Sequence, residues 1–165
     1  MTTKNSTLVS NFEANPMSMS PAHQLNGVSR TIQGTVALLT SDLNANDIVM
    51  LAPIPTNASV LSIKLFNDDL DSGSTNTCDV GLYTTDGTAV DDDAYASAIT
   101  DLRGAVTVGT EVAFEARDIN KCGQQVWQDG GQTSDPSTYY YIALTFDAAG
   151  NQAGDLSFQI QYVIN

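Results

Sequence analysis

The heptapeptide VLSIKLF at positions 60–66 decides the fold of this chain. Its apolar and polar side chains alternate, with Leu61, Ile63 and Leu65 predicted on one face and Ser62 and Lys64 on the other. A period of two is typical of a β-strand that buries one face. We therefore expect a half-buried strand here, and the surrounding stretch, residues 48–90, sets the inward and outward pattern for the rest.

The segments on either side of this strand support the same interpretation. Residues 52–58, APIPTNA, can form neither a helix nor a central strand, because two prolines remove main-chain donors and restrict the residues before them. Residues 67–77 are rich in Asp, Ser, Gly, Asn and Thr, which predicts a solvated loop. Cys78, Val80 and Leu82 then predict a second inward row, and Asp86-Gly87 is a strong turn signal.

Further strands are predicted before and after this stretch, at residues 31–39, 48–51, 106–115, 123–127, 139–146 and 156–164. Their expected inward residues are Ile32, Val36, Leu38, Val112, Phe114, Tyr140, Ile142, Leu144, Phe146, Leu156, Phe158, Ile160, Tyr162 and Ile164. Residues 94–99 are the best helical candidate, because aspartates at 91–93 would cap a helix start. About seven to nine short strands separated by turns predict an all-β, antiparallel, jelly-roll-like β-sandwich with at most one short helix.

Composition and net charge exclude several classes of partner. Hydrophobic residues make up 42% of the chain and charged residues 15%, which is typical of one globular domain. The formal net charge is −13, so the surface should repel nucleic acid and anionic membranes, and we expect neither as a partner. No apolar run is long enough to span a bilayer, and we expect no secretory signal at the N-terminus.

The first 28 residues differ from the rest and show no sustained period, so we expect an extended N-terminal arm (1–28) before a β-sandwich domain (29–165). Pro16 and Pro21 interrupt the arm, and its apolar side chains are scattered. Two interpretations stay open: a frayed terminus, or an arm that becomes ordered on a neighbouring subunit or partner. Under the second, the candidate capsid or subunit contacts are Leu8, Phe12, Met17, Met19, His23 and Leu25.

No residues point to catalysis. His23 is the single histidine and lies in the arm, where it is a poor base for a catalytic triad or dyad. Carboxylate pairs could hydrolyse glycosides, and the candidates are Asp68, Asp69, Asp71, Asp91, Asp92, Asp93 and Glu115. Nothing in the sequence places one of them in the apolar pocket that a general acid needs. We therefore expect no enzyme, no catalytic residue and no cofactor.

Two other kinds of site are compatible with parts of the sequence. The acidic segments at 68–73 and 91–93 could bind calcium, but the EF-hand spacing and its terminal glutamate are missing, so solvated loops are favoured and no metal is expected. Trp127, Tyr83, Tyr139 and Tyr141 could form a platform for a sugar, yet aromatic residues are also ordinary in strands. Cys78 and Cys122 lack metal spacing, and free thiols are favoured over a bridge.

A resemblance to a known family suggests a function. The segments that carry it are LAPIPTNASVL at 51–61, DVGLY at 79–83, DGTAV at 86–90 and DAY at 93–95. They resemble the head decoration, or cement, proteins of tailed bacteriophages, which are small β-sandwich subunits, often trimeric, that sit on assembled capsids. The recognisable text covers residues 51–95, and the arm matches no motif. No catalytic residue is implied.

The resemblance implies a non-enzymatic virion protein that binds the outer capsid surface and stabilises the shell. The implied partners are the major capsid protein and sister subunits in a homotrimer, and the implied location is the capsid surface, after synthesis in the host cytoplasm. The alternative is a carbohydrate- or receptor-binding module of a tail fibre or adhesin. A metal-stabilised adhesin domain is a third possibility.

Overall fold

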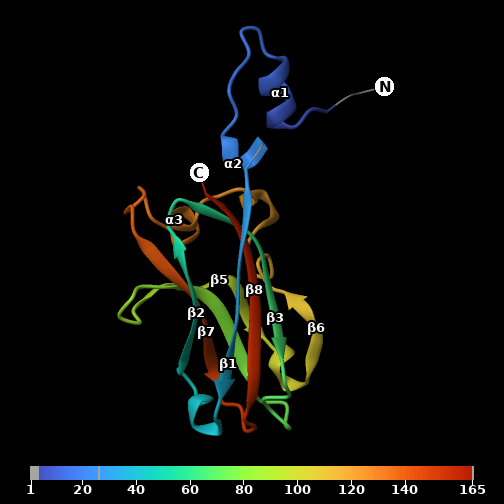
Figure 1. The fold of residues 1–165 in the computed structure, drawn as a ribbon, viewed down its shortest axis with the longest axis vertical. Coiled ribbons are helices and arrows are strands. Elements are labelled where there is room, and N and C mark those ends of the chain that lie inside the picture. Colours follow the sequence, from blue (N-terminus) through green and yellow to red (C-terminus); the bar gives the residue numbers. More distant parts are fainter. Residues whose placement is uncertain (1–3, 26, 165) are drawn as a thin grey trace.

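The computed structural model describes residues 4–25 and 27–164. Within these ranges, eight strands form two antiparallel sheets of four strands each, packed face to face (Figure 1). The strands are β1 (Ser29–Leu38), β2 (Ile48–Pro55), β3 (Ala58–Asn67), β4 (Thr77–Tyr83), β5 (Ala89–Ile99), β6 (Val106–Glu111), β7 (Tyr139–Ala148) and β8 (Gly154–Ile164). One sheet has the order β1-β8-β3-β6 and the other β2-β7-β4-β5. The predicted all-β antiparallel sandwich is confirmed.

Helical structure is short and lies at the periphery. The α-helices are α1 (Thr7–Glu13), α2 (Ala22–Leu25) and α3 (Val126–Asp129), and the 3-10 turns are η1 (Thr40–Asp42), η2 (Asp101–Arg103) and η3 (Ile119–Lys121). Among the described residues, no helix has both the length and the apolar character needed to cross a membrane.

The helix predicted at residues 94–99 is wrong, because these residues belong to β5. Tertiary packing overrides the capping signal: Tyr95 and Ala96 are buried, and β5 pairs with β4 through several register shifts. Between the pairs Val80–Ala96 and Leu82–Asp91, β5 has more residues than β4 and bulges.

The predicted strand at 123–127 is also wrong. Gly123 has a φ of +84°, which ends the extended backbone, and Gln125 is the N-cap residue of α3. Its main-chain N–H donates to Gln128 Oε1 over 3.0 Å. Val126 is therefore buried, and Trp127 half-buried, by a turn of helix and not by a sheet.

The prediction that the proline-rich segment forms neither a helix nor a central strand is confirmed. Pro53 and Pro55 lie in β2, which is an edge strand, where a missing main-chain donor costs no ladder hydrogen bond. Thr56 and Asn57 then carry the chain from one sheet to the other. The Asp86-Gly87 turn is also confirmed: Gly87 has a φ of +83°, and its N–H donates to Thr84 O over 3.1 Å.

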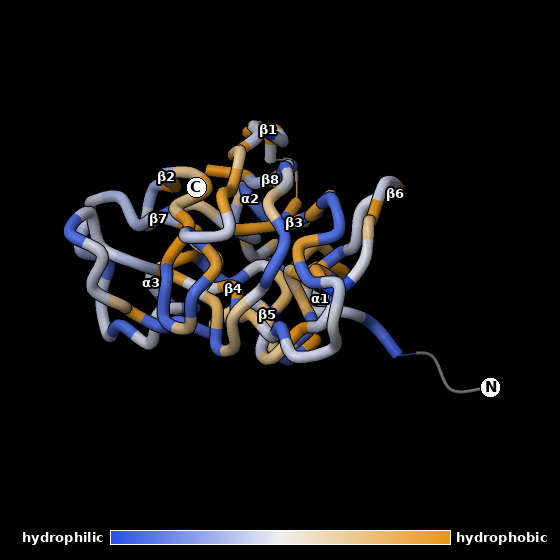
Figure 2. The backbone as a smooth tube through the Cα atoms, turned by 90° about the horizontal axis from the view of Figure 1, so that it is seen from below, coloured by the Kyte–Doolittle hydropathy of each residue, from blue (hydrophilic) through white to orange (hydrophobic). Residues whose placement is uncertain are grey.

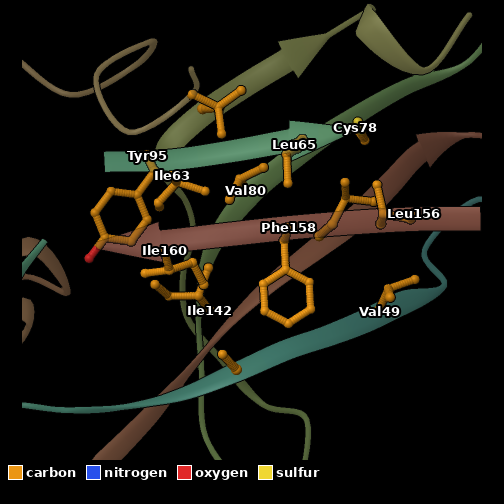
Figure 3. Packing of buried hydrophobic residues seen from close by; sticks show 14 of the residues in the cluster. Val49, Ile63, Leu65, Cys78, Val80, Tyr95, Ile142, Leu156, Phe158 and Ile160 are labelled. Carbon is orange, nitrogen blue, oxygen red and sulfur yellow. The ribbon is translucent and has the colours of Figure 1, made fainter. Parts of the chain in front are cut away.

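The core fills the space between the two sheets (Figure 3). The inward rows of β4 and β7 are buried as predicted, and Leu156, Phe158 and Ile160 line the core from β8. Figure 2 shows that apolar residues are concentrated in the central strands and polar residues in the outer loops. Burying such side chains contributes about 1.5–3 kcal/mol each, so the core dominates the stability of the sandwich.

Leu61 is an exception, because it is 42% exposed although its heptapeptide predicts an inward position. The register between β3 and β8 shifts between Val60 and Ser62, so Leu61 is the extra residue of a β-bulge. Val60 takes the inward place before the bulge. At the end of β8, Val163 is likewise buried while Tyr162 and Ile164 are half-buried.

Candidate interaction surface

The arm stands clear of the sandwich, beyond the end where β1 begins (Figure 1). Its helix α1 starts at the cap Ser6, whose Oγ accepts from Val9 N–H over 3.3 Å. No residue of α1 is buried. A seven-residue helix is marginal in water without tertiary packing. The surface of α1 is therefore largely exposed.

Five of the six predicted contact residues come together in the arm. An apolar hollow of about 220 Å³ is lined by Leu8, Phe12, Met17, Met19 and Leu25, together with two serines. Phe12 is 70% exposed, Met17 61% and Met19 89%. The return segment after α1 is held by Asn11, whose main-chain O accepts from Ser18 N–H over 3.0 Å. Chain order alone placed these residues in one arm, but not in one hollow.

His23 lies apart from this hollow, at the root of the arm. Its Nε2 donates to Gly123 O over 3.2 Å, and its Nδ1 is buried without a hydrogen-bond partner among the described residues. Gly123 O also accepts from Ser59 Oγ over 3.3 Å, so one carbonyl joins the arm to β3. This hydrogen bond links His23 of the arm to the loop around Gly123.

Beneath the root lies a buried ion pair that the sequence did not reveal. Arg117 Nη2 is 3.0 Å from Asp129 Oδ1, and both side chains are almost fully buried. The guanidinium also lies over the rings of Phe114 and Tyr95, at 4.9 and 5.8 Å from their centres. Tyr95 Oη donates to Asp129 Oδ2 over 3.3 Å. One cation thus joins β5, α3 and the intervening loop.

Arg117 also organises the loop that receives the arm. Its Nη2 donates to Lys121 O over 3.1 Å and its Nη1 to Val60 O over 3.3 Å. Burial raises the pKa of Asp129 to about 6, although the nearby guanidinium and the Tyr95 hydroxyl lower it. No period or spacing marks this cluster, and the scarcity of basic residues in the chain was the one available signal.

The acidic segment at 68–73 is a structural loop. The carboxylate of Asp71 accepts hydrogen bonds from the N–H groups of Asn76, Thr75 and Gly73 over 2.9, 3.0 and 3.1 Å. The bond from Asn76 is the main cause that lowers the pKa of Asp71. Asp68 Oδ2 accepts from Asp155 N–H over 2.9 Å. These oxygens hold the loop together instead of converging on a point where a cation could sit.

The second acidic segment lies on the bulge of β5. Among the described residues, 91–93 is the one group of three or more carboxylates that could share a metal, with ligand atoms within 4.8 Å of one another. Burial, and then the neighbouring Asp93, raise the pKa of Asp91. Glu115 is engaged elsewhere, since its Oε2 accepts from Ser97 N–H over 2.8 Å. The seven candidate acids therefore do not assemble into one cleft.

The four aromatic residues do not form one exposed platform, although Tyr83 pairs with Tyr141 across β4 and β7. Tyr83 is 2% exposed, and its hydroxyl is hydrogen-bonded to Thr145 Oγ1. Trp127 is half-buried in α3, and its indole N–H donates to Gln125 Oε1 over 2.7 Å. Tyr139 is exposed and Tyr141 half-buried on β7. A stacked sugar would find few free ring faces here.

Both cysteines are free, as predicted. Cys78 is buried in the core, and this burial raises the pKa of its thiol. Cys122 is exposed beside Gly123, at the root of the arm.

Comparison with known proteins gives a likeness in fold. No protein family matches the sequence, and no curated protein does either. A chain of the cyanophage Pam1 capsid asymmetric unit superposes over 100% of both chains, with a TM-score of 0.60 and 18% identity. A chain in the capsid of Ralstonia phage GP4 covers 89% of this chain and 91% of its own, with a TM-score of 0.56 and 17% identity. The sandwich fold of this protein is therefore one that chains of phage capsids also have.

Proposed function

We propose that this protein is a non-enzymatic structural component of a tailed-phage virion that binds the outer surface of the capsid and stabilises the shell. The observation that carries the proposal is the likeness to a chain of the Pam1 capsid asymmetric unit, which extends over the full length of both chains, arm included. The segments that resemble cement proteins support it from the sequence side.

The physical reason is that a shell is stabilised by any ligand that binds the assembled state better than the free capsid subunits. A rigid sandwich with an exposed apolar arm meets that need without chemistry. In this proposal Leu8, Phe12, Met17, Met19 and Leu25 contact capsid or a sister subunit, and His23 holds the arm in place. The working assembly is a homotrimer on the major capsid protein, formed after synthesis in the host cytoplasm.

The direct test is co-sedimentation with expanded empty capsids. We expect the full chain to sediment with capsids, and the full-length double variant Phe12→Ser/Met19→Ser to remain in the supernatant. Deletion of residues 2–27 should abolish binding as well. Unchanged binding and unchanged trimerisation after the deletion would refute the role of the arm, whereas no binding of the intact protein to any phage capsid would refute the function.

The alternative, a carbohydrate- or receptor-binding module, has less support in the geometry because Tyr83 is buried and Trp127 is already hydrogen-bonded. It predicts binding on a glycan array that disappears in Trp127→Ala. Binding to capsids but to no glycan would favour the proposed function.

A further inference from the structure

One sheet edge differs from the other three. β1 is ten residues long, pairs with β8 in an unbroken register and contains no proline. Among the described residues, no main-chain hydrogen bond links β1 to any element besides β8. Long regular edges with free N–H and C=O groups are templates for another strand.

The other three edges are blunted. β2 contains two prolines and a register shift, β5 bulges repeatedly against β4, and β6 has six residues with a register shift against β3. The gap between β5 and β6 is also closed, because Val112 N–H donates to Ile63 O over 2.8 Å and Ala116 N–H to Tyr95 O over 2.9 Å. Residues 112–116, which follow β6, thereby form main-chain hydrogen bonds to a strand of each sheet.

The opposite side, between β1 and β2, is open. A cavity of about 540 Å³ lies there, with apolar side chains from Val36 and Leu38 of β1 and from Ile48, Val49 and Met50 of β2. Its remaining lining comes from Ala37 and from the polar residues Ser41, Asp42 and Asp47. A strand added to the edge of β1 would point every second side chain into this cavity and the others toward solvent. The site therefore fits a segment in which small polar and long apolar residues alternate.

The arm contains such a segment. Residues 17–20 read Met-Ser-Met-Ser between Pro16 and Pro21. Ser18 N–H and Ser20 Oγ are bonded to Asn11, on one side of the segment. The N–H groups of Met17 and Met19 bond to none of the described residues. In extended chain, alternate residues direct their main-chain groups to opposite sides, so the methionine positions are free to pair with an edge.

Charge selects a second copy as the donor. Residues 14–41, which include both the Met-Ser segment and β1, form the longest stretch without Asp or Glu in a chain with a formal net charge of −13. Two copies repel each other over most of their surfaces, and the Met-Ser segment brings no acidic side chain of its own to Asp42 and Asp47 in the cavity lining. Within one copy the arm points away from the cavity, because α2 is fixed at Gly123 through His23.

We propose that the Met-Ser segment of one copy adds as a strand to the β1 edge of the next, with Met17 and Met19 in the cavity beside Val36. Such a contact is heterologous, so repeated copies form a ring only where the rotation between them closes, and a closed ring of three copies would be the proposed trimer. The inference rests on the proposed function only for the choice of the arm as a contact segment. Its test uses isolated protein, so failure to bind capsids leaves it standing.

The test is complementation between two full-length variants, followed by light scattering after gel filtration. Met17→Pro/Met19→Pro removes the two free donors but keeps the edge, and Val36→Lys puts a charge in the cavity but keeps the arm. We expect each variant alone to be monomeric and an equal mixture to form a one-to-one pair. The matched control Gln33→Lys, on the solvent face of β1, should assemble as the parent does.

The other outcomes overturn the inference in distinguishable ways. Self-association of the proline variant would indicate pairing between two β1 edges, and self-association of Val36→Lys would indicate contact between two arms. A monomeric parent at high concentration would exclude the contact altogether. If Val36→Lys fails to fold, Met19→Cys/Val36→Cys in a Cys122→Ser background replaces it: disulfide-linked oligomers are expected, and a bridge within one chain would refute the exchange.

Discussion

The arm and the buried ion pair beneath its root are close in space but differ in how deeply their side chains are buried. In the arm, α1 buries no residue and the large apolar side chains face outward. At the root, Arg117 and Asp129 are buried together, and the guanidinium is packed against two aromatic rings. The buried pair is therefore held by contacts within the chain, whereas the large apolar side chains of the arm are exposed. Substitutions in the two regions should therefore change different measurements.

The largest effect on stability is expected from Arg117→Ala. It leaves the carboxylate of Asp129 buried without its cation, and such changes cost about 3–5 kcal/mol in unfolding free energy. Urea denaturation followed by fluorescence measures this loss. The double variant Arg117→Met/Asp129→Leu should recover most of it, while the exposed control Lys121→Met should stay close to the parent. A loss below about 1 kcal/mol would mean that the pair contributes little.

The pH dependence of stability probes the same cluster. Burial raises the pKa of Asp129 from 3.8 to about 6, so the folded state binds its proton more tightly than the unfolded state does. The contribution is fully present below about pH 4 and is lost as the pH rises to about 6, by up to about 3 kcal/mol. Because the pKa values of other carboxylates are shifted in both directions, the measurement is the difference in unfolding free energy between parent and Asp129→Asn across that range. A difference that does not vary with pH contradicts it.

Gly81→Ala should destabilise the bulged part of β5. A Cβ on Gly81 would lie 2.2 Å from Asp91 O and 2.3 Å from the carbonyl group of Asp92, so the main chain must move. Overpacking of this kind costs about 1–3 kcal/mol. Thermal unfolding measures the change, and Gly104→Ala is the control because a Cβ there meets no atom within 4 Å.

In the arm, Phe12→Ser/Met19→Ser should change the unfolding free energy by less than about 0.5 kcal/mol, since both side chains are exposed. The same variant should lose binding to capsids. A clear drop in the melting temperature of this variant together with unchanged binding to capsids would mean that these arm residues stabilise the fold and do not contact the capsid.

The smallest effect is expected from chelation. The oxygens of Asp71 already accept three main-chain hydrogen bonds, so removal of calcium should leave the melting temperature unchanged. A large downward shift in chelator would instead support the metal-stabilised adhesin. Substitution of residues 91–93 by asparagine would then show whether the β5 bulge is responsible.

Sequence patterns predicted those parts of the molecule where one local rule decides the structure. Alternation identified the inward rows of β7 and β8, and prolines marked β2 as unfit for the sheet centre. The failures occurred where contacts distant in sequence decide. Aspartates before residues 94–99 imitate a helix cap, but Tyr95 is drawn into the core by Asp129 and Arg117. The bulge at Leu61 likewise depends on its pairing with β8.

The sequence predicted which arm residues belong to the candidate interaction surface, but not how they are arranged. Composition distinguished the arm and identified its apolar residues, because no strand period includes them. The hollow depends on Asn11, which turns the chain back along α1 through Ser18 and Ser20. The open β1 edge depends on which strands lie at the ends of the sheets, and single-sequence patterns carry no such information.

The pairing of Ser29 with Val163 places the start of β1 next to the end of β8. Strands paired in this way lie about 5 Å apart, so a short linker could join them. The chain could then be opened at the Asp86-Gly87 turn to give a circular permutant with the same sheets. Because the linker replaces the residues before β1, that molecule would lack the arm, and its new ends would lie at a surface turn. Any property that it keeps would belong to the sandwich alone.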